Sequence, residues 1–292
     1  MKSIFDYLYE NRVVTFGGAN STYGECIILA GGSGSGKGFI KNRIDARFKS
    51  YDVDDLKLKY QKMLNQGKLK DELRDFDFSN PEDVTELHMR VKEHGWKEKQ
   101  IELLFRNKYN PNKEANNSKI LPNILFDRVS GKIEDVTEIA TRAKTLGYNV
   151  TLVWVLCNIE SAKSSNMSRK RKVDNETVLI PLHKAVYETM TDLFSNKYPD
   201  FNDYIDNAWI GYSAGFGRDL SGKYEKSPVI RLKKDSEGKW IFNKEEMVDE
   251  FLKIQQPINY EALKENLRKH RKVAETKAFC KLENIDLEKE AA

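Results

Sequence analysis

Short apolar runs alternate with amphipathic segments through the first two thirds of the chain. The run from Cys26 to Ala30 is apolar and lies between glycines, which predicts a buried strand. Further strands are expected at 50–53, 120–127, 149–157 and, as the last one, 208–212. Apolar residues recur at helical spacing over 37–48, 54–66, 133–146 and 181–198. This alternation predicts an α/β fold in which helices sandwich a parallel sheet.

A charged segment, residues 68–119, interrupts this alternation. Pro81 follows Asn80 and marks the start of a helix that we expect to continue to Arg106. The polar residues after it read as a loop, so we interpret 68–119 as a helical insertion into the core.

The insertion also contains aromatic residues and histidines. Phe76, Phe78 and Trp96 could stack on a nucleic-acid base, although core packing is the commoner role of such residues. His88 and His94 show no ligand partners at a recognisable spacing, so we assign neither metal binding nor catalysis to them.

The last third of the chain has a different pattern. Two apolar stretches, 228–232 and 239–242, are separated by a polar turn sequence and predict a β-hairpin. From about Lys244 onward the pattern is helical. We therefore expect a core over 1–222, followed over 223–292 by a hairpin and a basic helix.

A glycine-rich sequence separates the first strand from the first helix. Residues 31–37 match the pattern G-x-x-x-x-G-K. Glycines let main-chain N–H groups turn inward as a nest for anions, and the next helix adds its positive end. A Gly/Ser linker, the alternative, does not account for the strand and helix on either side. We assign ATP binding to Gly31, Gly32, Ser33, Gly34, Ser35, Gly36, Lys37 and Gly38.

Two residues of this loop have particular consequences. Lys37 would bring its charge to the β- and γ-phosphates. Gly38 stands where the motif usually has a serine or threonine whose hydroxyl binds Mg²⁺. Either Asp54, Asp127, water and phosphates hold the metal, or activity is lost. Because glycine is a poor helix former, Gly38 also predicts a close backbone approach at this point.

Acidic residues follow two of the predicted strands, the second at Asp52, Asp54 and Asp55 and the third at Asp127. Ligands bind at the carboxyl ends of strands in open α/β sheets, where one carboxylate can accept a proton and another can organise Mg²⁺. We expect Asp54 and Asp127 to hold the metal. Asp52, Asp127 and Arg128 are expected to contact the substrate. Alternatively, Asp54 or Asp55 only caps the next helix, and Asp127 only pairs with Arg128.

A basic segment follows the strand that ends at Cys157. Between Ser161 and Val173 there are five positive residues and no acid. Arginines here could close over the triphosphate, exclude water and neutralise developing charge. The guanidinium binds two phosphate oxygens at once, which favours Arg169 and Arg171 as the catalytic pair. A solvated basic face is the alternative.

Together these residues resemble the P-loop kinases that include zeta toxins and polynucleotide kinases, over roughly residues 24–200. In that group a short strand ends in an acidic signature, here Asp52-Val53-Asp54-Asp55. The lid carries an asparagine and spaced arginines, here Asn166-Met-Ser-Arg169-Lys-Arg171, and a hydrophobic-proline pair, here the late Ile180-Pro181. The missing hydroxyl at Gly38 and the insertion at 68–119 depart from the group.

The resemblance implies transfer of the γ-phosphoryl group of ATP to an alcohol, with Mg²⁺ as cofactor. Asp54 falls on the position of the family's general base. Lys37 and the loop amides would hold the β- and γ-phosphates. Arg169 and Arg171 would stabilise the transition state.

The acceptor is left open by the sequence. Residues 260–281 contain seven basic and three acidic residues and predict a helix whose basic face follows a nucleic-acid backbone or is solvated. We favour a nucleic acid held by the basic segments 163–172 and 264–281, phosphorylated on a hydroxymethylated DNA base, as by certain viral P-loop kinases, or on a 5′-hydroxyl end. A nucleotide-sugar hydroxyl, the zeta-toxin acceptor, is one alternative. A nucleotide-dependent nucleic-acid-binding protein or ATPase is another.

Composition narrows the class further. The 292 residues are 39% hydrophobic and 11% aromatic, too rich in core-forming residues for a disordered chain. The net charge of +4 neither requires nor excludes nucleic acid. The three cysteines lack metal-ligand spacing, and Cys26 and Cys157 are expected to be buried. No signal peptide and no apolar run of membrane-spanning length are found, so we expect no membrane partner and a cytoplasmic protein (host cytoplasm if viral).

Overall fold

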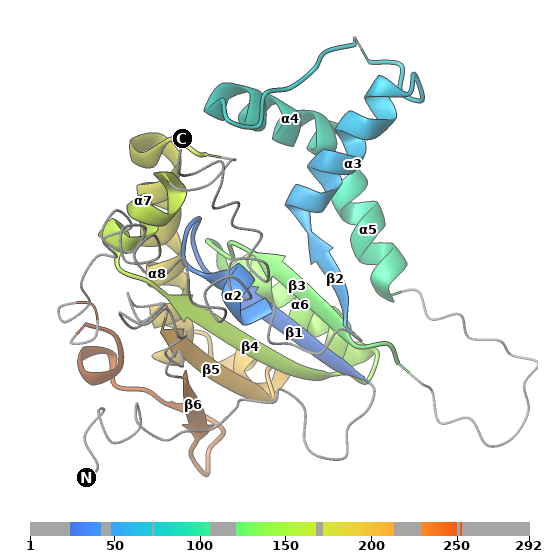
Figure 1. The fold of residues 1–292 in the computed structure, drawn as a ribbon. Helices are drawn as coiled ribbons and strands as arrows, with labels where there is room; N and C mark the ends of the chain where they lie inside the picture. The colour runs from blue at the N-terminus through green and yellow to red at the C-terminus, as the bar shows by residue number, and fades with distance from the viewer. Residues whose placement is uncertain are drawn as a thin grey trace, which may run out of the picture.

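One continuous sheet with helices on both faces forms the centre of the computed structural model (Figure 1). The structure describes residues 24–41, 48–71, 73–105, 121–167, 172–212, 229–249 and 252. Five parallel strands come first in the chain: β1 (Glu25–Ala30), β2 (Lys49–Asp52), β3 (Ile124–Arg128), β4 (Asn149–Leu156) and β5 (Asn207–Tyr212). These strands confirm the predicted α/β class.

The sheet has the strand order β2-β3-β1-β4-β5-β6-β7. Because β3 and β4 flank β1 on opposite sides, the chain leaves β1 and β3 in opposite directions along the sheet. The carboxyl end of β1 is therefore a topological switch point, the place where open α/β sheets bind ligands. The glycine-rich loop begins there, directly after Ala30.

Alternate residues of β1 face opposite layers, as the period of a strand requires. Cys26 and Ile28 belong to the large core cluster under helices α6 (Ile133–Thr145) and α8 (Ile180–Phe194). Ile27 and Leu29 pack on the other face with Ile40 of α2 (Lys37–Lys41). Both faces of the sheet are thus covered, and the predicted burial of Cys26 and Cys157 is confirmed.

The insertion contributes two helices where the sequence predicted one. The predicted helix from Pro81 to Arg106 is divided into α4 (Pro81–Glu93) and α5 (Trp96–Phe105). Gly95 separates them with a φ of +63°, a left-handed conformation that breaks a helix and suits glycine. Together with α3 (Val53–Asn65), these helices form an arm beside β2 (Figure 1).

The aromatic residues of the insertion pack inside this arm. Phe76 is buried, and the guanidinium groups of Arg74 and Arg90 both lie 5.1 Å from its ring centre. Trp96 meets Tyr60 of α3 edge to face, with ring centroids 5.5 Å apart. Core packing therefore accounts for these side chains, as expected for their type.

The sheet continues beyond β5, so the prediction that 208–212 is its last strand is wrong. The predicted hairpin is present as β6 (Val229–Lys234) and β7 (Trp240–Ile241), and β6 pairs antiparallel with β5. This part of the C-terminal segment extends the core sheet. The domain division after residue 222 stays a prediction, and the predicted basic helix at 264–281 lies outside the described residues.

Several helix boundaries differ from the sequence prediction. α7 (Ile159–Met167) follows β4, and a π-helical turn, Asn175–Leu179, leads into α8 one residue before the predicted start. A 3-10 turn, Pro199–Tyr204, and a second π-helical turn, Glu245–Asp249, complete the elements. Among the described residues, no helix has the length and apolar character needed to cross a membrane.

Candidate active site

The glycine-rich loop bends sharply between β1 and α2, as its sequence predicts. Gly34 and Gly36 have φ angles of +79° and +91°, which glycine adopts without strain. A Cβ atom added at Gly34 would lie 2.5 Å from the carbonyl oxygen of Ala162 in α7. The loop is therefore held between the end of β1 and the helix that precedes the predicted lid.

Lys37 folds back over this loop. Its ammonium group donates hydrogen bonds to the carbonyl oxygens of Gly31 and Gly32, at 2.6 and 3.1 Å. The same Nζ atom lies 4.0 Å from Oδ1 of Asp127 at the end of β3. The positive charge thus stands over the mouth of the loop, where phosphates bind in P-loop proteins.

Ser35 has a buried hydroxyl with no hydrogen-bond partner in the described part of the chain. An unsatisfied buried oxygen is costly for a folded protein and calls for an explanation. Its position inside the loop suits a partner supplied by a bound phosphate group. A Cβ added at Gly31 would lie 2.6 Å from this Oγ, so a side chain at this position would have to displace the hydroxyl.

The structure overturns one expectation about Gly38. A Cβ atom built at this position would meet no atom of the other described residues within 4 Å, apart from its own helix, so no close backbone approach in the described part of the chain explains the glycine. The residue is exposed in the first turn of α2. A serine hydroxyl would fit here, and its absence is a chemical feature of the site rather than a packing requirement.

Asp127 is the most enclosed carboxylate beside the loop. Burial raises its pKa, and the nearby Lys37 only partly opposes this effect, while Asp52 adds to it. Asp127 of β3 lies directly opposite Asp52 of β2 in the register of the two adjacent strands. This position brings their two carboxylates together. Arg128 instead pairs with Asp135 of α6, at 3.0 Å, so the alternative pairing with Asp127 is not what the chain adopts.

Asp52 and Asp54, at the junction of β2 and α3, make different contacts. Asp52 caps α3: its Oδ1 accepts the N–H of Asp54 at 2.9 Å, and its Oδ2 pairs with Lys41 at 2.9 Å. The capping role proposed as an alternative for Asp54 or Asp55 therefore belongs to Asp52. Asp54 lies in the first turn of α3, with a side chain 39% exposed and 3.4 Å from Nζ of Lys57. Its charge also acts on Asp127 and raises the pKa of that carboxyl.

The fit of Mg²⁺ can be judged from these donors. Asp127 suits the ion. The raised pKa of this buried carboxyl shows that the surrounding positive charge does not balance its negative charge, and a bound Mg²⁺ would do so. Asp54 already contacts Lys57. Within the described ranges, no three His, Cys, Asp or Glu side chains gather as a metal site. A divalent ion held here would depend on phosphate and water oxygens for most of its ligands, which is how proteins usually bind Mg²⁺.

The predicted lid is described only at its two ends. Nδ2 of Asn166 donates to the carbonyl oxygen of Val173 at 2.7 Å, and the N–H of Val173 donates back to Oδ1 of Asn166 at 3.1 Å. These bonds join the two ends of the segment. Arg169 and Arg171 lie outside the described residues, so their catalytic role stays a prediction.

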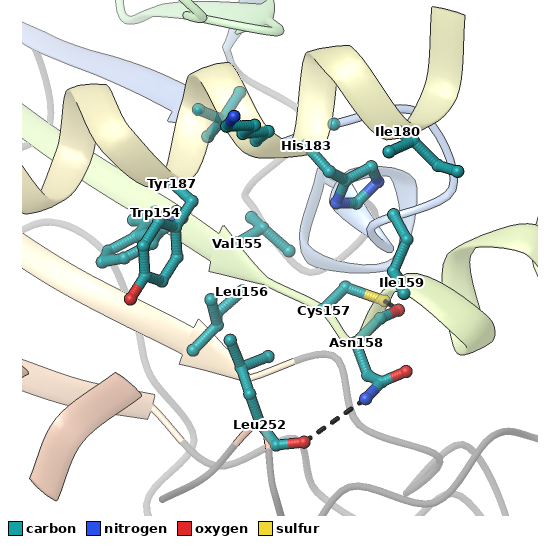
Figure 2. Close-up of a pocket in the computed structure, with 13 residues that line it drawn as sticks. Trp154, Val155, Leu156, Cys157, Asn158, Ile159, Ile180, His183, Tyr187 and Leu252 are labelled. Carbon is teal, nitrogen blue, oxygen red and sulfur yellow. Dashed lines mark hydrogen bonds between the residues drawn. The ribbon is translucent and has the colours of Figure 1, made fainter. Parts of the chain in front are cut away.

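His183 of α8 is a site residue that the sequence analysis missed. Its Nε2 lies 2.7 Å from the carbonyl oxygen of Ser33, which can only accept, so the imidazole donates this bond. Burial lowers the pKa of His183, and Lys37 lowers it further against the opposing effect of this bond. A neutral imidazole therefore supports the loop from the α8 side (Figure 2). Only its position in a helix after the lid could have suggested it.

A cavity of about 310 Å³ adjoins this contact (Figure 2). Its wall includes Trp154 of β4, His183 and Tyr187 of α8, and Leu252. Nδ2 of Asn158 donates a hydrogen bond to the Leu252 carbonyl oxygen at 3.3 Å. The cavity thus lies on the α8 side of the glycine-rich loop.

Neither a protein-family model nor a curated protein matches this sequence. Solved structures do resemble the fold. A chain of the crystal structure of AvrRxo1-ORF1:-ORF2 with ATP has a TM-score of 0.50 and 13% identity, over 90% of this chain and 77% of that chain. At this identity the likeness shows the fold alone.

Two other solved structures resemble the chain more distantly. The PezAT chromosomal toxin-antitoxin system of Streptococcus pneumoniae has a TM-score of 0.44 and 13% identity, over 87% of this chain and 88% of that chain. Deoxyadenosine kinase from M. mycoides with bound dATP has a TM-score of 0.29 and 14% identity, over 61% of this chain and 87% of that chain.

Proposed function

We propose that this protein is an ATP-dependent phosphotransferase that acts on an alcohol. One observation carries the proposal. The glycine-rich loop ends β1 at the switch point of the sheet, and Lys37 lies over it beside the buried Asp127. The similar fold in the AvrRxo1-ORF1:-ORF2 structure, which was solved with ATP, supports the same use of the loop.

The loop and its neighbours bind and orient ATP. Main-chain N–H groups of the loop and the Ser35 hydroxyl donate to the phosphates. Lys37 exchanges its two carbonyl partners for oxygens of the β- and γ-phosphates. Asp127 would hold Mg²⁺, and the ion would supply positive charge to offset the charge of these phosphates. His183 holds the loop in place through Ser33.

Transfer then requires an oriented hydroxyl. The acceptor oxygen forms a bond to the γ-phosphorus, and the bond from that phosphorus to the β,γ-bridging oxygen breaks, which releases ADP. The hydroxyl proton passes to the carboxylate of Asp54, whose place at the edge of the site is set by α3. Arg169 and Arg171 of the predicted lid neutralise the charge that develops on the transferred group.

For the acceptor, we place a small molecule of the nucleotide-sugar class ahead of a nucleic acid. The resemblance of the phosphate loop, acidic signature and lid to those of zeta toxins supports this choice. The nucleic-acid acceptor depended on basic residues in 163–172 and 264–281. Most of these lie outside the described residues, and Lys163 is paired with Glu160 at 3.1 Å.

Label transfer from γ-labelled ATP tests the proposal. The protein is incubated with nucleotide sugars, with 5′-hydroxyl oligonucleotides and with hydroxymethyl-base DNA, each beside a Lys37→Ala control. Label on a nucleotide sugar, absent with Lys37→Ala, supports both reaction and acceptor. Label on a polymer keeps the kinase and changes the acceptor. Label released only as free phosphate identifies an ATPase and contradicts the proposal.

A further inference from the structure

The cavity between β4 and α8, next to the glycine-rich loop, has a largely apolar wall (Figure 2). Apolar and aromatic side chains form most of this wall, among them Trp154, Leu156, Ile180 and Tyr187. Its volume of about 310 Å³ is at the lower end of the range found for small-molecule sites. Apolar cavities bind small apolar molecules in preference to water. The cavity therefore has the size and the surface of a site for one small ring system.

The cavity and helix α2 lie on opposite faces of the sheet. Leu156 and Val186, which line the cavity, belong to the core cluster under α8. Ile40 of α2 packs on the other face, with Ile27 and Leu29 of β1. Phosphates bind at the main-chain N–H groups of such a loop and at the N-terminus of the helix that follows it, which here is α2. A molecule in the cavity therefore leaves the phosphate-binding side of the loop free for ATP.

His183 belongs both to the cavity wall and to the support of the loop. Its Nε2 donates to the carbonyl oxygen of Ser33 at 2.7 Å, and burial lowers its pKa, so the imidazole is neutral at pH 7. A neutral imidazole carries one proton, so Nδ1 is an acceptor when Nε2 donates. Among the described residues Nδ1 has no hydrogen-bond partner, and it is not enclosed by protein atoms. His183 therefore provides an acceptor within a largely apolar surface.

Other polar side chains of the wall already have partners within the protein. Nδ2 of Asn158 donates to the carbonyl oxygen of Leu252 at 3.3 Å. The hydroxyl of Tyr187 donates to Oδ1 of Asp249 at 2.6 Å. A ligand with one N–H group is thus matched to Nδ1 of His183, and the rest of its surface is matched to the apolar wall.

We propose that this cavity binds a planar heteroaromatic molecule whose N–H group donates to Nδ1 of His183, and that this ligand strengthens ATP binding. The site is additional to the ATP and acceptor sites of the proposed function. A donor at Nδ1 keeps the imidazole proton on Nε2, because the hydrogen bond of one ring nitrogen sets the protonation of the other. The Nε2–H group then holds the Ser33 carbonyl and keeps the loop in its bent shape. ATP meets a loop that is already ordered, so each ligand favours the other.

Calorimetric titration of the full-length protein with indole and with benzofuran tests the site. The two probes share one fused-ring shape, but benzofuran has an oxygen atom where indole has its N–H group. Indole is expected to bind about fivefold more tightly, the factor that corresponds to one neutral hydrogen bond of about 1 kcal/mol. Equal affinities for the two probes, or no binding of indole, overturn the inference.

Variants place the bound probe in the cavity. Ile180→Phe enlarges a side chain of the cavity wall and should weaken indole binding about tenfold. Ile241→Phe makes the same change at an exposed position of β7 and should leave indole binding unchanged. His183→Leu removes the acceptor and should bind both probes alike, which decides the question even where Ile180→Phe does not fold. Thermal unfolding shows which variants are folded. Full indole affinity in folded Ile180→Phe, or a preference for indole that survives in His183→Leu, overturns the inference.

The effect on ATP binding is measured with Mg²⁺ and the non-hydrolysable analogue adenylyl imidodiphosphate. Saturating indole should tighten binding of the analogue about fivefold, and the analogue should tighten indole binding by the same factor, because linkage is reciprocal. Benzofuran cannot donate to Nδ1 and should leave binding of the analogue unchanged. Competition between indole and the analogue, or the same effect from both probes, overturns the inference. If the analogue does not bind at all, the kinase proposal fails, while the indole titrations still decide whether the cavity is a binding site.

Discussion

His183 donates a hydrogen bond to the carbonyl oxygen of Ser33 at 2.7 Å, which links α8 directly to the phosphate loop. The two residues are 150 positions apart in the chain. Directly beside this bond, Gly32 leaves the space that the imidazole occupies: a Cβ at Gly32 would lie 2.3 Å from Cδ2 of His183. The shape of the loop and the placement of α8 therefore depend on each other.

This relationship predicts the effect of Gly32→Ala. The added methyl group displaces His183 and leaves the part-buried Ser33 carbonyl without its bond, a loss of about 1 kcal/mol. We expect weaker binding of an ATP analogue, measured by titration calorimetry, and a lower melting temperature. In the double variant Gly32→Ala/His183→Ala the clash is gone, so it should bind like His183→Ala alone. Fully additive losses would show that the two positions act independently.

Asp54 and Asp55 form a matched pair for testing the general base. Asp54→Asn removes the proton acceptor but keeps size and hydrogen bonding, so ATP-analogue binding should persist while transfer falls by about 10²-fold or more. Asp55→Asn, an exposed neighbour in the same helical turn, should retain transfer. Rates of label transfer under single-turnover conditions make the comparison. Full transfer by Asp54→Asn would remove this residue from the base role.

Gly38 offers a gain-of-function test. Within the described ranges no neighbouring residue obstructs a side chain there, so Gly38→Ser should fold and place a hydroxyl where P-loop proteins bind Mg²⁺. We expect Gly38→Ser to bind an ATP analogue more tightly than the unsubstituted protein in Mg²⁺ and equally without it. Gly38→Ala is the control: it should gain up to about 1 kcal/mol of helix stability without the Mg²⁺ effect. The same affinity change in both variants would indicate helix stability alone.

Much of the sheet could be predicted from local patterns, for a physical reason. Strands buried on both faces read as continuous apolar runs, and β1 and β4 are such strands. The phosphate loop has a short-range pattern between a strand and a helix. No local sequence pattern specifies the order of the strands in the sheet. The position of Asp52 opposite Asp127 could therefore be expected only because both residues end a strand.

The contacts that the sequence did not show join residues on different helices. His88 has no partner at a ligand spacing, and its partner Lys97 lies beyond the helix break at Gly95. That break was itself missed, because the apolar pattern continues across it. In the sequence, Lys57 is one of several charged residues of α3. Its effect on the pKa of His88 of α4 depends on the packing of the helices and could not be predicted from the sequence.

Asp127 predicts how stability depends on pH. Burial raises the pKa of this carboxyl above its ordinary value of 3.8, so the folded chain holds the proton more tightly than the unfolded chain. Stability is therefore lost as pH rises from the unfolded pKa through the folded one. Above this window the protein carries an unfavourable buried charge, which Asp127→Asn removes at nearly constant shape.

We accordingly expect Asp127→Asn to melt a few degrees higher than the unsubstituted protein at pH 7, which corresponds to about 1 kcal/mol of stability. This difference in melting temperature should shrink towards pH 4. Asp200→Asn, at an exposed position, should show no such trend. Calorimetric scans across this pH range give the measurement. With Mg²⁺ and an ATP analogue at pH 7, the unsubstituted protein should have the higher melting temperature of the two. The metal supplies the positive charge that the Asp127 carboxylate lacks, whereas the neutral amide of the variant gains little from it. If the analogue and metal stabilise both proteins equally, Asp127 does not hold the ion.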